Sequence, residues 1–144
     1  MYRQPNESCP LLITAFQGRV FGIDRQSGEI IWKVKMSTSV DTGEAVELAV
    51  DDDVVVACTR NGLAFIDYET GKVHKLIQRD DVPSGARRPT MIIDGNRIFV
   101  TGFGALACYT VKGDLVWEQR FKSEGFGDLA IGFPHKVRQA DMHG

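Results

Sequence analysis

The stretch Gly18-Arg-Val-Phe-Gly-Ile-Asp-Arg-Gln-Ser-Gly-Glu-Ile-Ile-Trp32 decides the fold of this chain. Two short runs rich in apolar and β-branched residues flank the dipeptide Ser27-Gly28, which is typical of a tight turn. The pattern therefore predicts a strand, a turn and a second strand. It occurs twice more, over Gly62–Lys75 and over Gly104–Trp117.

The spacing of the turn glycines shows that these stretches are repeats. Gly28, Gly71 and Gly113 follow one another at intervals of 43 and 42 residues. A period of about 40–45 residues built from short strands is typical of the blades of a β-propeller. Helix signals are weak, because no long window keeps apolar residues at i, i+3, i+4 and i+7. The sequence therefore predicts an all-β protein with three four-stranded blades.

The first blade is expected to lack one strand. The plan consists of a polar leader and three blades, at residues 1–10, 11–36, 46–78 and 90–122. Nothing before Leu11 corresponds to the first strand of the other blades, but Asp128-Leu-Ala-Ile131 is similar to Glu47-Leu-Ala-Val50. We therefore expect a closing strand at about residues 127–132, and a single half-propeller domain over residues 11–144.

The units resemble the pyrroloquinoline-quinone-type (PQQ-like) propeller repeat, in which an Asp, a Thr/Ser-Gly pair and a Trp follow one another at fixed spacing. The residues that match this motif are Asp24, Gly28, Trp32, Asp67, Gly71, Gly113 and Trp117. The second unit departs from it at Lys75, which replaces the Trp, and the third departs at Thr110, which replaces the Asp. The resemblance implies the propeller fold.

A structural role is expected for each residue of the motif. The glycines permit a positive φ in the turn. The aspartates, Asp24 and Asp67, are expected to accept hydrogen bonds from turn N–H groups. Trp32 and Trp117 are expected to pack between neighbouring blades, where the gap widens toward the rim.

Three blades cannot close a ring, because propellers typically have four to eight. An arc of three would leave an apolar face bare at each end, and burying apolar surface is worth about 25 cal/mol per Å². We therefore expect a homodimer that forms one six-bladed propeller around a two-fold axis. In it the strand at residues 127–132 of each chain would complete the first blade of its partner. The alternative is a piece of a longer propeller or an open assembly.

Charge and composition exclude several partners. The formal net charge is -2 at pH 7, so we expect neither nucleic acid nor an anionic membrane surface as a partner. The longest apolar runs are strand-sized, so no membrane span is expected. The N-terminus is polar and lacks an export-signal pattern, and the cysteines, Cys9, Cys58 and Cys108, are odd in number. Together these features predict a cytoplasmic protein with reduced thiols.

No local motif of the sequence carries chemistry, although residues of a Ser/His/Asp or Cys/His site can also assemble across a fold. The resemblance implies that a quinone enzyme would need a Trp beneath its cofactor, a calcium ion and a catalytic Asp, yet Trp32 and Trp117 both occupy repeat positions. No CxxC, HxH or HExxH spacing is found, so no metal site is expected. Cys58 and Cys108 lie in apolar runs and are expected to be packing residues. We expect no cofactor and no enzymatic activity.

The best candidate for partner binding is the polar connection at residues 79–89. It contains Arg79, Arg87 and Arg88, which would suit an acidic protein or peptide. We therefore expect a non-catalytic binding or scaffold module that presents its loop faces to a protein or peptide partner. The alternative is a small-molecule-binding or enzymatic propeller that uses its central channel.

Overall fold

The computed structural model describes residues 10–36, 46–59, 62–78, 89–102, 105–121, 129–134 and 136–138. These residues form strands, turns and irregular connections, and none of them lies in a helix. The strands are β1 (Leu11–Phe16), β2 (Arg19–Asp24), β3 (Ile30–Lys35), β4 (Glu47–Val50), β5 (Val54–Thr59), β6 (Gly62–Asp67), β7 (Val73–Gln78), β8 (Thr90–Asp94), β9 (Arg97–Gly102), β10 (Ala105–Thr110), β11 (Leu115–Gln119), β12 (Ile131–Phe133) and β13 (Lys136–Arg138). The prediction of an all-β chain is confirmed.

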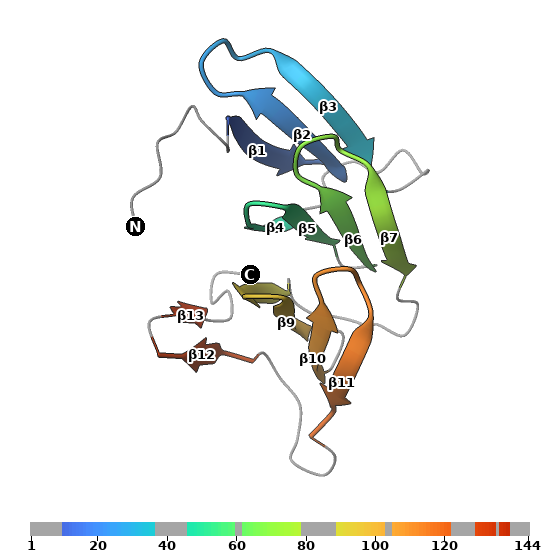
Figure 1. Cartoon of the computed structure of the whole chain (residues 1–144). Helices are drawn as coiled ribbons and strands as arrows, with labels where there is room; N and C mark the ends of the chain where they lie inside the picture. The colour runs from blue at the N-terminus through green and yellow to red at the C-terminus, as the bar shows by residue number, and fades with distance from the viewer. Residues whose placement is uncertain are drawn as a thin grey trace.

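The strands form antiparallel sheets in chain order, which we name blade 1 (β1-β2-β3), blade 2 (β4-β5-β6-β7) and blade 3 (β8-β9-β10-β11). Figure 1 shows the blades following one another around an arc, with β3, β7 and β11 on its outer side. On the inner side, β4 lies against both β1 and β8. Successive sheets therefore stack face to face, as the blades of a propeller do.

Blade 2 is buried on both faces, and its sequence explains why. All six residues of β5, Val54–Thr59, are buried. Val54, Val56 and Cys58 belong to the core between blades 2 and 3, whereas Val55 and Ala57 belong to the core between blades 1 and 2. Because successive side chains of a strand point to opposite faces, an unbroken apolar run supplies both cores at once.

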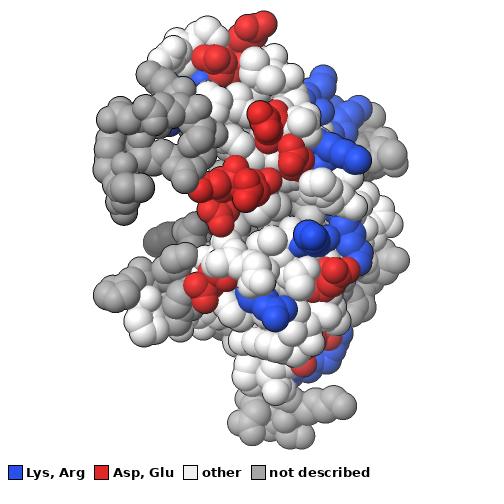
Figure 2. Space-filling view, in the orientation of Figure 1, with Lys and Arg blue, Asp and Glu red and all other residues white. Residues whose placement is uncertain are grey.

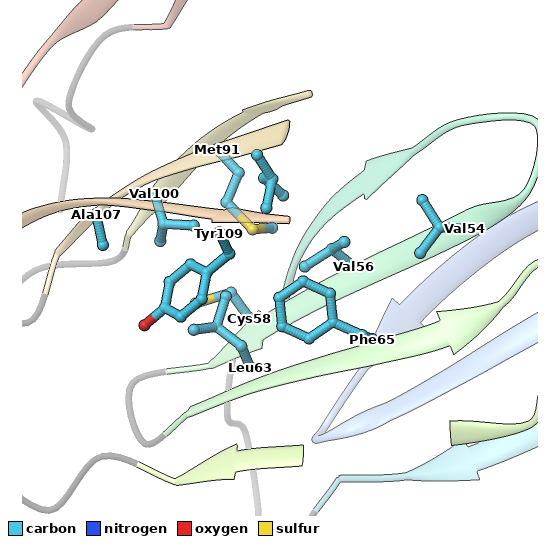
Figure 3. Packing of buried hydrophobic residues seen from close by; sticks show 10 residues of the cluster. Val54, Val56, Cys58, Leu63, Phe65, Met91, Val100, Ala107 and Tyr109 are labelled. Carbon is cyan, nitrogen blue, oxygen red and sulfur yellow. The ribbon is translucent and has the colours of Figure 1, made fainter. Parts of the chain in front are cut away.

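Aromatic and aliphatic side chains fill the core between blades 2 and 3, which Figure 3 shows from close by. Phe65 of β6 and Leu63 beside it are fully buried, and the Phe65 ring lies 5.9 Å from the ring of Tyr109 in blade 3. Met91 and Val100 contribute from β8 and β9. Cys58 is buried in the same core, as predicted, and Cys108 is buried in blade 3.

Blade 1 has three strands, and the closing strand differs from the prediction. β12 begins at Ile131, later than expected, and Leu129 and Ala130 precede it outside any strand, while residues 127 and 128 lie outside the described part. β12 pairs with β13 in a hairpin of its own, and β13 lies against β8. Within one copy the hairpin pairs locally, so the predicted addition of a strand to a partner's first blade is not tested.

No described helix is long and apolar enough to cross a membrane.

Candidate functional site

The turn of each repeat is built in the same way. In blade 1 the Asp24 carboxylate accepts hydrogen bonds from the N–H groups of Gln26 (2.8 Å) and Ser27 (3.0 Å). The N–H of Gly28 donates to the Asp24 carbonyl over 2.8 Å, and Gly28 has a φ of 79°. A positive φ suits glycine, which has no Cβ to clash. The predicted roles of Asp24 and Gly28 are therefore confirmed.

The turn of blade 2 repeats this geometry and adds a hydroxyl. The Asp67 carboxylate accepts from both the N–H and the hydroxyl of Thr70, each over 2.8 Å. Gly71 has a φ of 78° and donates its N–H to the Asp67 carbonyl. His74 of β7 lies 3.8 Å from the same carboxylate, an ion pair when the imidazole is protonated.

Hydrogen bonds to the two carboxylates favour their charged form. For Asp24 the N–H of Ser27 has the largest effect and the N–H of Gln26 the next, and together they lower the pKa of the carboxyl. For Asp67 the Thr70 hydroxyl has the largest effect, followed by the Thr70 N–H, and the pKa is again lowered. Both shifts come from local turn geometry, which makes these carboxylates structural groups.

In blade 3 the side chain of Thr110, in place of an aspartate, accepts the hydrogen bonds of the turn. The Thr110 hydroxyl accepts hydrogen bonds from the N–H of Lys112 (3.3 Å) and of Asp114 (3.1 Å). Gly113 has a φ of 97° and donates its N–H to the Thr110 carbonyl over 2.9 Å. The departure from the motif at Thr110 therefore keeps the turn and removes its charge.

Trp32 fills the gap between blades 1 and 2, as predicted. Its side chain is only 7% exposed, and its Nε1 donates a 2.9 Å hydrogen bond to the Tyr68 carbonyl of blade 2. A Cβ on Gly71 would lie 2.6 Å from Trp32 Cγ, and a Cβ on Gly22 would collide with the same ring. The indole is therefore held between Gly22 of its own blade and the turn glycine of the next blade.

Lys75 occupies the corresponding place between blades 2 and 3. A Cβ on Gly113 would lie 2.8 Å from Lys75 Cδ and 3.1 Å from Phe65 Cδ1, so the aliphatic part of the lysine covers the turn glycine. Its Nζ lies 3.3 Å from the Asp114 carboxylate. Phe65 takes the strand position that Gly22 has in blade 1, because it pairs with Lys75 as Gly22 pairs with Trp32. The larger residue fills the space that the missing indole leaves.

Trp117 has different surroundings from those of Trp32. It ends the third motif, but 43% of its surface is exposed, and its ring lies 6.1 Å from that of Phe99 in the same blade. The described residues place no further four-stranded sheet beyond blade 3, so the expected packing of Trp117 between two blades is not tested within one copy.

At the other end of the arc, Gly28 is equally uncovered. A Cβ on Gly28 would meet none of the described atoms within 4 Å, although its φ matches that of Gly71. The arc therefore ends in two unmatched halves of the same contact. One is the tryptophan of blade 3, and the other is the turn glycine of blade 1.

The outer face of blade 1 is apolar. Leu12 and Phe16 of β1 are 57% and 56% exposed. Phe16 stacks on Phe21 of β2 with ring centroids 5.4 Å apart. Leu11 and Ile13 pack against the core shared with blade 2, so the alternate residue Leu12 points to the opposite face. This is the face that a preceding blade would cover.

Charges are distributed unevenly between the two ends of the strands. Figure 2 shows acidic side chains gathered on the side of the molecule that carries the β4–β5 turn, formed by Asp51–Asp53. The Tyr68 N–H donates to the Asp53 carbonyl, which places the β6–β7 turn at the same end. Arg19 and Lys35, which pair in β2 and β3, lie at the opposite end.

The sequence-predicted partner-binding residues are not tested by the structure. Arg79, Arg87 and Arg88 lie outside the described residues, in the connection between β7 and β8. Within the described part, no group of three or more His, Cys, Asp and Glu side chains could hold a metal ion. Gly22 and Tyr68 both contact the Trp32 indole in the seam, by which we mean the contact between two successive blades. The sequence did not predict these contacts, although counting back from the turn would have placed Gly22 opposite Trp32.

Stacked antiparallel sheets whose turns carry a repeated Asp/Thr, Gly and Trp/Lys motif define a segment of a β-propeller. The profile of the family described as "Outer membrane protein assembly factor BamB" matches residues 16–135. The chain belongs to this PQQ-like propeller repeat family. No curated protein sequence matches the chain.

Solved structures agree on the fold. The structure of BamB from Moraxella catarrhalis is 17% identical with a TM-score of 0.63, over 90% of this chain and 39% of that one. A europium-containing methanol dehydrogenase is 18% identical with a TM-score of 0.57, over 75% of this chain and 22% of that one. The dihydro-heme d1 dehydrogenase NirN, in complex with DHE, is 18% identical with a TM-score of 0.58, over 78% and 25%. This chain therefore spans well under half the length of each.

Proposed function

We propose that this chain is a non-catalytic binding module whose propeller ring is completed by a second copy and whose loops bind a protein or peptide partner. The observation that carries the proposal is the state of the two ends of the arc. Trp117 at one end is 43% exposed, whereas the equivalent Trp32 is 7% exposed. Leu12 and Phe16 expose apolar surface at the other end. Two copies related by a two-fold axis would cover all of these residues.

The open edge of blade 1 supports the same arrangement. Blades 2 and 3 each begin with an inner strand, β4 and β8, but no described strand pairs with β1 on the side away from β2. The β12–β13 hairpin lies against β8, at the end of the arc that a partner's blade 1 would cover. In the proposed ring one strand of this hairpin extends β1 of the partner, which removes an exposed edge.

The molar mass in solution tests the ring. The chain has a mass of 16.0 kDa, so we expect light scattering to report about twice this value at micromolar concentration, without larger species. A stable monomer would overturn the proposed ring, and so would a trimer or an open series of oligomers.

The partner-binding part of the proposal rests on charge. The connection that contains Arg79, Arg87 and Arg88 starts after Gln78, at the end of blade 2 opposite the acidic β4–β5 turn. An acidic peptide would therefore approach the basic end and be repelled from the other. Fluorescence anisotropy with a labelled oligoglutamate peptide tests this, with the triple variant R79E/R87E/R88E compared with a K33E/K72E/K112E control.

We expect the arginine variant to lose peptide binding and the lysine control to keep most of it. Equal loss in both would show a non-specific charge effect and overturn the assignment of the arginines.

The likeness to two dehydrogenases concerns the fold alone, and their reactions are not part of this proposal. A cytoplasmic location stays a prediction of the sequence, which cell fractionation with an antibody against the chain would test.

A further inference from the structure

We propose that the ring closes through a specific pair of residues, in which Trp117 of each copy packs on Gly28 of the other. This inference rests on the proposed function, because it assumes that a second copy completes the ring. It adds the residues that hold the copies together. A two-fold axis would create the contact twice, once at each junction between blade 3 of one copy and blade 1 of the other.

The seam between blades 1 and 2 shows what such a contact looks like. There the Trp32 indole covers Gly71 so closely that a Cβ on the glycine would lie 2.6 Å from the ring. The indole also donates a hydrogen bond to the Tyr68 carbonyl, just after the aspartate of the same turn. A turn glycine and the tryptophan of the preceding blade are therefore complementary surfaces in this fold.

Gly28 has the same turn conformation as Gly71, but no described side chain covers it. Its φ of 79° matches the 78° of Gly71. The two turns share the same backbone hydrogen bond, from the glycine N–H to the aspartate carbonyl. Yet a Cβ added to Gly28 would have no described atom within 4 Å. The turn therefore has room for an indole that none of the described residues supplies.

Trp117 occupies the position in blade 3 that Trp32 occupies in blade 1. It pairs with Cys108 across β10 and β11, as Trp32 pairs with Gly22 across β2 and β3. In both places a small residue lies opposite the tryptophan on the neighbouring strand, whereas bulky Phe65 lies opposite Lys75. Trp117 thus has the same cross-strand setting as Trp32, and 43% of its surface is exposed to a partner.

Sedimentation equilibrium of point variants tests the pair. Trp117→Ala removes the indole. Gly28→Asn places a side chain where the partner's indole would pack, and asparagine is the residue that tolerates a positive φ best after glycine. We expect each to raise the dissociation constant of the dimer about 30-fold or more, as loss of a buried interface tryptophan does. Val116→Ala and Gly95→Asn are matched controls. Val116 is 42% exposed on the same strand, and Gly95 has a φ of 60° with open space around it.

Mixing the two variants gives a second, independent readout. A mixed dimer of Trp117→Ala and Gly28→Asn has one junction with both native residues and one junction with neither. We therefore expect its dissociation constant to lie between those of the wild-type dimer and of either variant alone. Absence of this recovery would overturn the pairing, because the two residues would then act in separate places.

The outcomes separate this inference from the proposed ring. A wild-type chain that stays monomeric refutes the ring and the pair together. A wild-type dimer whose affinity is unchanged by Trp117→Ala and Gly28→Asn refutes only the pair and leaves the ring standing. A loss of affinity in the Val116→Ala or Gly95→Asn controls equal to that in the test variants also refutes the pair.

Discussion

Trp32 and Trp117 end the same repeat motif, and each lies opposite a small residue on the neighbouring strand. Their surroundings differ, because the Trp32 indole contacts Gly71 of the next blade, whereas the Trp117 indole lies near the Phe99 ring of its own blade. At the scale of single residues, the turn glycine therefore has two separate roles. It adopts a positive φ, and it leaves room for the side chain that arrives from the preceding blade.

Substitution of Gly71 by alanine separates these two roles. We expect Gly71→Ala to lower the free energy of unfolding by about 1–3 kcal/mol more than Gly95→Ala does, because only Gly71 carries a covering indole. Both glycines have a positive φ, so both variants share a backbone cost of about 1–2 kcal/mol. Urea denaturation followed by circular dichroism measures the difference. Equal losses would show that Trp32 moves aside without cost.

At the scale of single elements, each turn is held by a side chain that reaches back to its own backbone. Asp24 and Asp67 do this as carboxylates, and Thr110 does it as a neutral hydroxyl. The pKa of each aspartate is lowered by these bonds. We therefore expect acid to weaken the turns of blades 1 and 2 through this mechanism, which does not act at Thr110.

The stability of the chain should depend on the charge of Asp67. Because its pKa is lowered in the folded state, its stabilising contribution is present above the unfolded value of about 3.9 and is lost as the pH falls through the folded value. We expect Asp67→Asn to lower the urea midpoint at pH 6 and the difference from wild type to shrink between pH 4 and pH 2. Asp94→Asn, outside the turn motif, serves as the control. Parallel pH curves for wild type and Asp67→Asn would contradict the prediction.

The unbroken apolar run of β5 contributes side chains to two separate cores. The unfolding free energies of double variants, compared with those of the single variants, can test whether the two cores are independent. Val55 belongs to the core with blade 1 and Val56 to the core with blade 3. We expect Val55→Ala and Val56→Ala each to cost about 2 kcal/mol, with a double variant additive within about 0.5 kcal/mol. Val56→Ala combined with Phe65→Leu should deviate further from additivity, because this pair is directly opposite in one core.

At the scale of the whole molecule, the described residues bury the faces between successive blades and leave apolar side chains exposed on the outer faces of blades 1 and 3. Blade 2 buries both of its faces, whereas the outer face of blade 1 carries exposed Leu12 and Phe16. Each seam is formed by matched residues, so an arc that ends with unmatched ones is suited to bind more of the same. This property of the ends supports the ring proposed above.

A charge on the outer face of blade 1 should therefore block association without unfolding the chain. Leu12 is 57% exposed, so we expect Leu12→Lys to change the free energy of unfolding of the monomer by less than about 0.5 kcal/mol. The same variant should weaken self-association at least about tenfold, because a lysine charge would be buried against the partner. Leu76→Lys is the matched control, since Leu76 is 46% exposed on blade 2, away from the ends. Light scattering over a dilution series measures the association.

Much of the architecture could be predicted from residues alone. The glycine spacing predicted repeated strand–turn–strand units, and the Asp-x-x-Ser/Thr-Gly pattern predicted turns held by a side chain. Both are local properties, because a turn is determined by the residues within it. The seam residues Gly22 and Tyr68 were not predicted, since their roles depend on contact between blades, and the C-terminal strand was placed too early because its pairing partner was unknown.

The sequence by itself determined the all-β class, the repeat and the turns that hold each blade, because these depend on interactions within about 15 residues. Only the tertiary structure decided which repeat residues are covered. Trp32 and Trp117 share one motif, yet burial requires a neighbouring sheet, and only Trp32 is followed by one among the described residues. Likewise, only the structure showed that the hairpin containing β12 lies beside β8, because strand pairing depends on which edges meet in space.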